Sequence, residues 1–267
     1  MASFSVVSNI SSANAQANLI QTNIGLNKAL TRLSSGFRIN YAGDDAAGLA
    51  VANAYRNDIS IVNQGIRNAN DGLSGLQIKD GALSNISTLL DRLATLSTQA
   101  ASGETSNASR STLDAEFQDV LTEIDREATV AQLTTQTGFS VFVSNNGTNG
   151  KVTGTIAAAS QAGLSLSGHV LTSQTSAQSA VAAVASAVTL LGSAQSTIGV
   201  LENRLSFAIS LAQSQVVNNT AAQSRIRDAN VAEESANLTR YNILSQSGIA
   251  ALSQANQSSS SVLSLLR

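Results

Sequence analysis

Two adjacent aspartates, Asp44 and Asp45, are the residues whose types and spacing most readily suggest chemistry. They lie in the stretch LSSGFRINYAGDDAAGLAV (33–51), a few residues after Arg38, Asn40 and Tyr41. Paired carboxylates beside a cation can form an acid–base dyad or a metal site, and they can also begin a helix. Only the first two interpretations make the chain an enzyme.

The other titratable groups form no recognisable catalytic set. His169 is the single histidine, so neither a two-histidine metal motif nor a Ser-His-Asp triad has support. The carboxylates of EFQDVLTEIDRE (116–127) fall near one helical face, but with Arg126 among them a solvated surface is favoured over a cation site. The chain has no cysteine, which excludes disulfides and thiolate metal sites. We predict no catalytic site, no metal and no cofactor.

A structural role explains the aspartate pair more simply. Gly36 can adopt the left-handed conformation that ends a helix, and Asp44 falls where the N-cap of the next helix belongs. Asp45 adds negative charge at the positive end of that helix dipole, and Gly43 adds backbone freedom before it. An enzyme that uses the pair remains the alternative. The predicted helix joint consists of Gly36, Arg38, Asn40, Gly43, Asp44 and Asp45.

Composition and charge narrow the class of protein. Proline is absent, although average usage predicts roughly 13, so no ring clash interrupts a helix anywhere. Residues 1–43 and 235–267 hold five cations and no acid, without the aromatic residues of a nucleic-acid surface. The start, MASFSVVSNISS, lacks the features of an ordinary signal peptide. The run AVAAVASAVTLLG is too short and alanine-rich to span a bilayer. We predict no nucleic-acid partner and no membrane insertion.

Apolar spacing is the strongest structural signal. A seam with a period of 3.5 residues predicts one helix from about 45 to 100, roughly 80 Å long and typical of a coiled-coil rod. The seam residues are Tyr55, Ile59, Val62, Ile66, Ala69, Leu73 and Leu76, continued by Leu83, Ile86, Leu90 and Leu93.

Further helices and one β region complete the expected fold. A polar stretch with Gly103 marks a turn, after which Leu113, Phe117, Val120, Ile124 and Ala128 line one helical face. Another helix is predicted over about 177–222, with Val188 among its inward residues. Between them, 131–176 shows β-branched alternation around the turn signal NNGTNG, which predicts two or more short strands. The fold class is mainly α: a long antiparallel helical bundle or coiled-coil rod with a small β-hairpin region, plus paired terminal helices.

Each end of the chain carries a weak apolar stripe that matches the other. We expect both ends to be poorly ordered in the free monomer and to become helical when they pack against copies of the chain. Neighbouring copies would then cover surfaces that one chain cannot bury, through contacts that extend into a helix. The predicted self-assembly residues are Ile20, Ile24, Leu30, Leu33, Leu244, Leu252, Val262 and Leu266.

Three separated motifs resemble bacterial flagellin, the filament subunit. They are LSSGFRINYAGDDAAGLAVA (33–52), ANDGLSGLQIKDGALSNISTLLDRL (69–93) and SRIRDANVAEESANLTRYNILSQSGIAALSQANQSSSSVLSLLR (224–267), and they occur in the family's order. The resemblance covers roughly 1–130 and 177–267. The intervening middle is short, so a form without inserted outer domains is expected.

The resemblance implies an architecture in four parts. These are a channel-lining helix with its joint (1–43), rod helices and β-hairpin region (44–176), a C-terminal rod helix (177–222) and a C-terminal channel-lining helix (223–267). The function implied is a structural subunit of the helical flagellar filament used for motility. A hook–filament junction protein is the alternative within the class, and a soluble coiled-coil adaptor is the alternative outside it.

The resemblance also implies partners and a location. The protein would be extracellular, in the filament, after type III export without a cleaved signal peptide. Its partners would be copies of itself, an export chaperone at about 235–267, and the flagellar cap and junction proteins. An innate immune receptor would contact Arg92, Leu96 and Glu116, although Ala94 and Thr95 depart from the family's usual Arg-Glu pair. Alternatively, Arg92 and Leu96 simply belong to inter-subunit packing.

Overall fold

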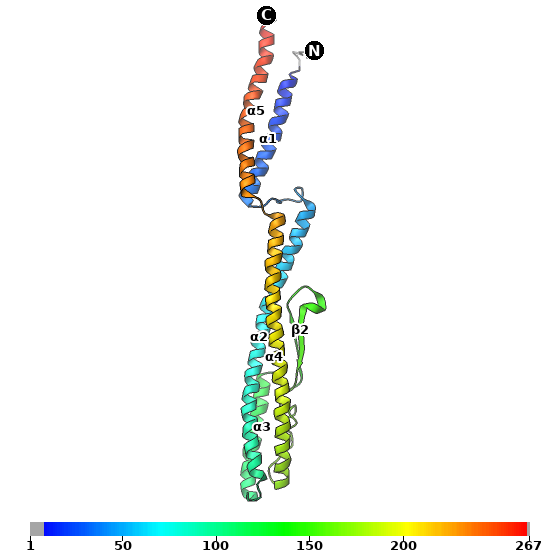
Figure 1. The fold of residues 1–267 in the computed structure, drawn as a ribbon, viewed down its shortest axis with the longest axis vertical. Coiled ribbons are helices and arrows are strands. Elements are labelled where there is room, and N and C mark those ends of the chain that lie inside the picture. The colour runs from blue at the N-terminus through cyan, green and yellow to red at the C-terminus, as the bar shows by residue number, and fades with distance from the viewer. Residues whose placement is uncertain (1–7, 266–267) are drawn as a thin grey trace. The chain divides into compact units, whose positions relative to one another are not determined.

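The structure is a computed structural model that describes residues 8–265, with all their side chains except those of Thr148 and 259–265. The described helices and strands follow the order α, α, α, β, β, α, α, and Figure 1 shows them along the chain. The helices are α1 (Ile10–Ser35), α2 (Ala46–Ala101), α3 (Asn107–Val130), α4 (Gln174–Arg227) and α5 (Val231–Leu265). Strands β1 (Thr137–Phe142) and β2 (Lys151–Ile156) flank the short 3-10 helix η1 (Gly147–Gly150). The predicted mainly α fold with a small β hairpin is confirmed.

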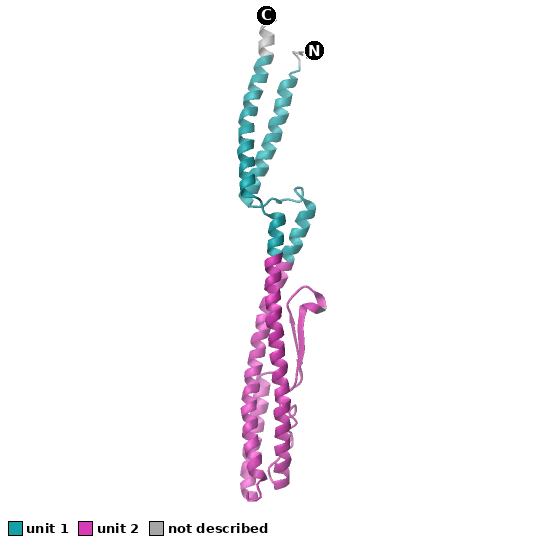
Figure 2. Cartoon of the chain, in the orientation of Figure 1, with its two compact units in different colours: residues 1–57, 219–267 teal, residues 58–218 magenta. Residues whose placement is uncertain are grey.

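The chain forms two compact units (Figure 2). Unit 1 combines 1–57 with 219–267, and unit 2 is 58–218. Helices α2 and α4 therefore contribute to both units, while α1 and α5 belong to unit 1 alone. The four-part division drawn from the sequence stays a prediction.

Unit 2 holds an extended apolar core built from α2, α3 and α4. Along α2, the predicted seam is buried at every seventh residue, for example at Val62, Ala69 and Leu76. Phe117 and Ile124 of α3 are buried as predicted. On α4 one prediction is wrong: Val188 is 46% exposed and Ala187 points inward instead. The alanine-rich run places apolar residues on several faces of the helix. The apolar spacing alone therefore did not show which of these residues is buried.

The β hairpin packs closely on the helices of unit 2. Its strands are antiparallel, with Thr137 opposite Ile156 and Phe142 opposite Lys151. The hairpin approaches α2 so closely at Gly65 that a Cβ there would lie 1.8 Å from the carbonyl oxygen of Val143. Only glycine permits this contact. The predicted strands between 131 and 176 are thereby confirmed, as one hairpin.

The turn between α2 and α3 is fixed by Arg110, a buried arginine. Its guanidinium donates to the carbonyl oxygens of Ala100 (2.8 Å) and Ser102 (2.7 Å) and to Asn107 Oδ1 (3.0 Å). The carbonyls that end α2 thus receive a positive charge, as the helix dipole favours.

The terminal segments differ from their expected state. Both are helical in the single chain, where we expected poorly ordered ends. The reason is that each end finds its partner within the same chain, because α1 and α5 lie side by side (Figure 1). Neither helix depends on its own weak local stability.

Candidate functional site

The pairing of α1 with α5 uses a seam on each helix, called here the inner seam. On α1 it consists of Ser12, Ala15, Leu19, Thr22, Leu26, Ala29 and Leu33, which step by three and four and are partly or fully buried. On α5 it consists of Glu234, Tyr241, Ser245, Gly248, Leu252 and Ala255. This is the heptad spacing of a coiled coil with small and polar residues at many positions.

Named contacts set the register of the inner seam. Asn9 Nδ2 donates to the carbonyl oxygen of Ala255 at 2.9 Å. A Cβ on Gly248 would lie 3.1 Å from Leu19, and one on Gly25 would lie 2.6 Å from the ring of Tyr241. Contact residues with higher numbers on α1 meet residues with lower numbers on α5, so the two helices are antiparallel. Small residues let the two backbones approach closely.

A second apolar stripe of the same helices, called here the outer stripe, is exposed in the single chain. It includes Ile20, Ile24 and Leu30 of α1 and Leu244 of α5, each about half exposed. Since α1 and α5 already pair through the inner seam, nothing in the described part of unit 1 covers these side chains. An apolar surface of this kind marks an interaction site.

The structure thus separates the predicted self-assembly residues into groups. Leu33 and Leu252 lie partly buried on the inner seam, so they contribute to pairing within one chain. Ile20, Ile24, Leu30 and Leu244 remain on the outer stripe. The side chain of Val262 and the whole of Leu266 lie outside the described residues.

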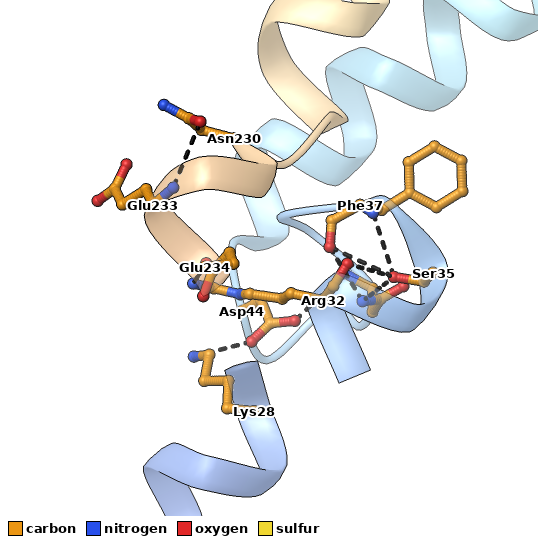
Figure 3. Close-up of polar contacts among 9 residues, drawn as sticks. Lys28, Arg32, Ser35, Phe37, Asp44, Asn230, Glu233 and Glu234 are labelled. Atoms are coloured by element: carbon orange, nitrogen blue, oxygen red, sulfur yellow. Dashed lines mark hydrogen bonds and ion pairs between the residues drawn. The ribbon is translucent and has the colours of Figure 1, made fainter. Parts of the chain in front are cut away.

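One ion pair beside the inner seam was missed by the sequence analysis. Arg32 Nη1 lies 2.9 Å from Glu234 Oε1, and Glu234 is only 8% exposed. Figure 3 shows the two side chains meeting between the end of α1 and the start of α5. A usable signal was present, because a cation in a last turn and an acid in a first turn both complement helix dipoles. Only the antiparallel pairing brings them together.

The predicted joint, residues 36–45, is a real connection between α1 and α2. Gly36 ends α1 with φ of 74°, in the left-handed region, and its amide donates to the carbonyl oxygen of Arg32 at 2.9 Å. Arg38 then donates its amide to the carbonyl oxygen of Arg227 (2.7 Å) and its Nη2 to that of Ile226 (2.7 Å). The connection between α1 and α2 is therefore hydrogen-bonded to the last residues of α4.

Aromatic and amide side chains reinforce this crossing. The Arg227 guanidinium lies over the Phe37 ring, 4.1 Å from its centroid, which is a cation–π contact. Asn40 Nδ2 donates to Ser35 Oγ (2.9 Å) and to the carbonyl oxygen of Phe37 (3.1 Å). Asn40 therefore holds the chain turned back on the end of α1.

The roles of the two aspartates are shifted by one residue from the prediction. Asp45, not Asp44, is the N-cap of α2, because its Oδ1 accepts the amide of Gly48 at 2.8 Å. Asp44 instead accepts the amides of Asn40 (3.2 Å) and Tyr41 (3.4 Å) and pairs with Lys28 at 2.9 Å. Either of two adjacent acidic residues before a helix can serve as its N-cap. The conformation of the preceding turn determines which of them does so.

The backbone freedom expected of Gly43 stays a prediction. Its φ is not in the left-handed region, and a Cβ there would meet nothing within 4 Å. The freedom specific to glycine is used at Gly36 instead.

Acidification is expected to weaken the joint through Asp44. The Lys28 ammonium, followed by the amides of Asn40 and Tyr41, holds the pKa of the Asp44 carboxyl below its ordinary value of 3.8. Because this pKa is lower in the folded chain than in the unfolded chain, the ionised Asp44 carboxylate stabilises the fold. The stabilisation is complete above the ordinary pKa and is lost as the pH falls through the lowered pKa of the folded chain. At neutral pH, the amides of residues 28–44 should therefore be better protected from hydrogen exchange in the wild type than in Asp44→Asn. In acid, the protection of the two proteins should become equal. An unchanged difference down to pH 2 would contradict this assignment.

Helix α4 presents an unusual exposed surface within unit 2. Residues 174–201 carry no charge and are mostly apolar or small. By length and composition alone α4 could cross a membrane, which is weak evidence because core helices of soluble proteins meet the same criterion. Val200, Phe207 and Leu211 lie seven and four residues apart and are all exposed. They form one stripe, called here the α4 stripe.

Comparison with known proteins identifies the family of this chain. Residues 6–146 match the family model described as the bacterial flagellin N-terminal helical region, and 181–266 match the C-terminal helical region. The chain belongs to the bacterial flagellin family. A flagellin of Halalkalibacterium halodurans is 36% identical, across 97% of this chain and 98% of that protein. Flagellin FlaB1 of Treponema pallidum is 33% identical over the same shares of both chains.

A solved structure is also similar. The crystal structure of Bacillus cereus flagellin matches with a TM-score of 0.48 and 28% identity, over 59% of this chain and 94% of that one. The flagellin of Listeria monocytogenes is 32% identical over 94% of this chain and 96% of its own length.

Membership of the flagellin family settles the class of function. The protein is a structural subunit of the bacterial flagellar filament, an extracellular assembly, and it is not an enzyme. Its length fits a short form, and the comparisons give no support to a hook–filament junction protein. The aspartate pair that suggested chemistry belongs to the joint of a flagellin subunit.

The residues proposed for an immune receptor are only partly available on this flagellin. Arg92 of α2 and Glu116 of α3 form an exposed ion pair. Leu96 is 1% exposed and lies in the core of unit 2. A contact through Leu96 is therefore wrong for the folded single chain, and so is its packing against another subunit. It belongs to the buried face of α2, three residues after the fully buried Leu93.

Proposed function

We propose that the outer stripe and the α4 stripe are the surfaces through which copies of this flagellin hold one another in the filament. The observation that carries the proposal is the apolar surface that unit 1 leaves exposed at Ile20, Ile24, Leu30 and Leu244. A subunit of a homopolymer has a partner for such a surface, namely another copy. The contact is heterologous, so it extends into a helical array.

The α4 stripe supplies a second contact of matching chemistry. Beside it, a hollow of ≈ 60 Å³ lies between the hairpin and α4, lined by Val143, Val152, Ala208 and Leu211 among others. Exposed apolar side chains beside a small hollow suit the apolar and small side chains of a second copy.

Phe207→Asp tests the α4 stripe. Phe207 is 76% exposed, so the substitution should leave unit 2 folded. Burying a phenylalanine is worth about 1.5–3 kcal/mol, and the critical concentration for polymerisation should therefore rise about tenfold or more. Electron microscopy and sedimentation of the purified protein under polymerising conditions give the measurement. Asn203→Asp, also exposed and one turn earlier, adds the same charge as a control. Equal assembly of both variants would remove the α4 stripe from the interface.

We further propose that an export chaperone binds the C-terminal end, about 235–267, before assembly. The inner seam of α5 has weak hydrophobicity and needs a partner, which α1 supplies in the folded chain and a chaperone would supply during type III export. The flagellar cap and junction proteins would contact subunits at the two ends of the filament. Co-purification of the chain, but not of a 1–234 truncation, with the chaperone would support this.

Recognition by an innate immune receptor is the remaining proposal. The exposed Arg92–Glu116 pair supports it, while the departures at Ala94 and Thr95 weaken the match. A cell reporter assay decides it, with no response at saturating protein as the outcome that refutes it.

A further inference from the structure

The turn between β1 and β2 carries reactive chemistry that filament assembly does not use. It contains two Asn-Gly steps, Asn146–Gly147 and Asn149–Gly150. In such a step the glycine backbone nitrogen can reach the asparagine side-chain amide, because no Cβ on the glycine obstructs the approach. We propose that Asn146 is a site of spontaneous deamidation in the folded chain, and that the fold protects Asn149.

The reaction needs only water. The nitrogen of Gly147 bonds to Cγ of Asn146, the bond from Cγ to Nδ2 breaks, and ammonia leaves with the proton of the glycine amide. Water then opens the resulting five-membered succinimide at one of its two carbonyls. The products are aspartate, or isoaspartate with the chain continued through Cγ. One water is consumed, one ammonia is released and one negative charge is gained.

The local structure leaves Asn146 free to react. Asn146 and Gly147 are both exposed, and the Asn146 side chain makes no capping hydrogen bond to η1. Gly147 is the first residue of η1, so its amide has no partner within that helix. The turn is a single 3-10 turn in which the amide of Asn149 donates to the carbonyl oxygen of Asn146 at 3.0 Å. Such a turn opens readily, which lets Asn146 rotate from its ψ of 37° toward attack.

The second step is held in place. Gly150 is buried, and its carbonyl oxygen accepts the amides of Val143 (2.7 Å) and Ser144 (3.1 Å). A Cβ on Gly150 would lie 2.1 Å from the carbonyl oxygen of Ser144, which shows how closely the two chains approach. Gly150, which supplies the attacking nitrogen for Asn149, is therefore held between the strands.

Two Asp-Gly steps illustrate the same protection in a helix. Asp71–Gly72 and Asp80–Gly81 can form the same succinimide by loss of water, but both lie inside α2. There each glycine amide donates to the carbonyl four residues earlier and the backbone cannot rotate. Among these four steps, Asn146–Gly147 alone combines exposure with an amide that is free of helical bonding.

A carboxylate at position 146 would act on the adjacent contact of the hairpin. Asn145 Nδ2 donates to Asp58 Oδ1 at 3.2 Å, and both belong to unit 2. A new negative charge one residue away disfavours a contact with an aspartate, and isoaspartate adds one backbone atom to the turn. Deamidation is therefore expected to loosen the hairpin tip.

Peptide mapping by mass spectrometry tests the proposal on the purified full-length monomer. After incubation at neutral and mildly alkaline pH, the tryptic peptide 127–151 reports both sites at once, and its fragments locate the added mass. Conversion at Asn146 should be about tenfold faster than at Asn149 in the folded chain and should accelerate with pH. In the guanidinium-unfolded chain the two rates should become similar.

Asn146→Gln is the matched control, because its longer side chain keeps the amide but disfavours the five-membered ring. That variant should retain position 146 unchanged over the same incubation. Equal rates at Asn146 and Asn149 in the folded chain, or no conversion at Asn146, would overturn the proposal. Because the test uses the monomer, it is independent of the proposed assembly surfaces.

Discussion

Ile24→Asp is expected to abolish filament formation while leaving α1 paired with α5. The Ile24 side chain is 56% exposed on the outer stripe, away from the inner seam. In the filament it would be buried against another copy, where an unpaired carboxylate cannot stay hydrated. Loss of the apolar contact costs about 1.5–3 kcal/mol, and the buried charge adds to this. The critical concentration should rise by well over tenfold, measured by sedimentation and electron microscopy.

Asn23→Asp is the control for this experiment. It places the same charge on the neighbouring exposed position without removing an apolar side chain. Far-ultraviolet circular dichroism and hydrogen exchange of α1 and α5 should be unchanged in both variants. Normal filaments from Ile24→Asp would show that the outer stripe faces solvent in the assembly.

Glu234→Ala is expected to open the paired terminal helices. Removal of this carboxylate leaves the Arg32 guanidinium, whose Nε is already buried without a partner, uncompensated beside the inner seam. Breaking a largely buried ion pair costs about 3 kcal/mol, which corresponds to roughly a hundredfold increase in local opening. Hydrogen exchange of the α1 amides should accelerate by that factor, while unit 2 should keep its protection.

Glu233→Ala provides a matched comparison within the same helical turn. Glu233 is exposed, and it complements the α5 dipole as Glu234 does, but it does not pair with Arg32. Its loss should therefore cost only a few tenths to about 1 kcal/mol. If the two variants opened α1 equally, the dipole rather than the ion pair would hold the helices together.

The joint at 36–45 and the Arg32–Glu234 ion pair both hold the two ends of the chain in place relative to each other. The two ends of the chain must pair in a fixed register before another copy can bind the outer stripe. Arg32–Glu234 fixes the start of the pairing, and the backbone bonds of Arg38 and Ala229 fix the crossing beside it. We infer that changes at either place affect assembly indirectly, through the geometry of the outer stripe.

Much of this protein follows from its sequence. The seven-residue repeat of α2 predicts a long helix whose inward residues include Leu76 and Leu90, and both are fully buried. Gly36 predicts the end of a helix and the turn signal at 145–150 predicts a hairpin, and both occur. These features depend on local rules of period, capping and turn chemistry, which neighbouring residues carry by themselves.

Other features needed the tertiary structure. The sequence showed one apolar stripe on each end, and only the pairing of α1 with α5 divides it into an inner seam with Leu33 and an outer stripe with Ile24. It also offered two acids for one cap, and the turn before α2 assigned Asp45 to the cap and Asp44 to Lys28. Arg32 and Glu234 stand 202 residues apart and meet only because the helices are antiparallel. The physical reason is common to all three. The type of a side chain and its spacing along the sequence limit which contacts it can make, whereas the packing of distant segments decides which of those contacts forms.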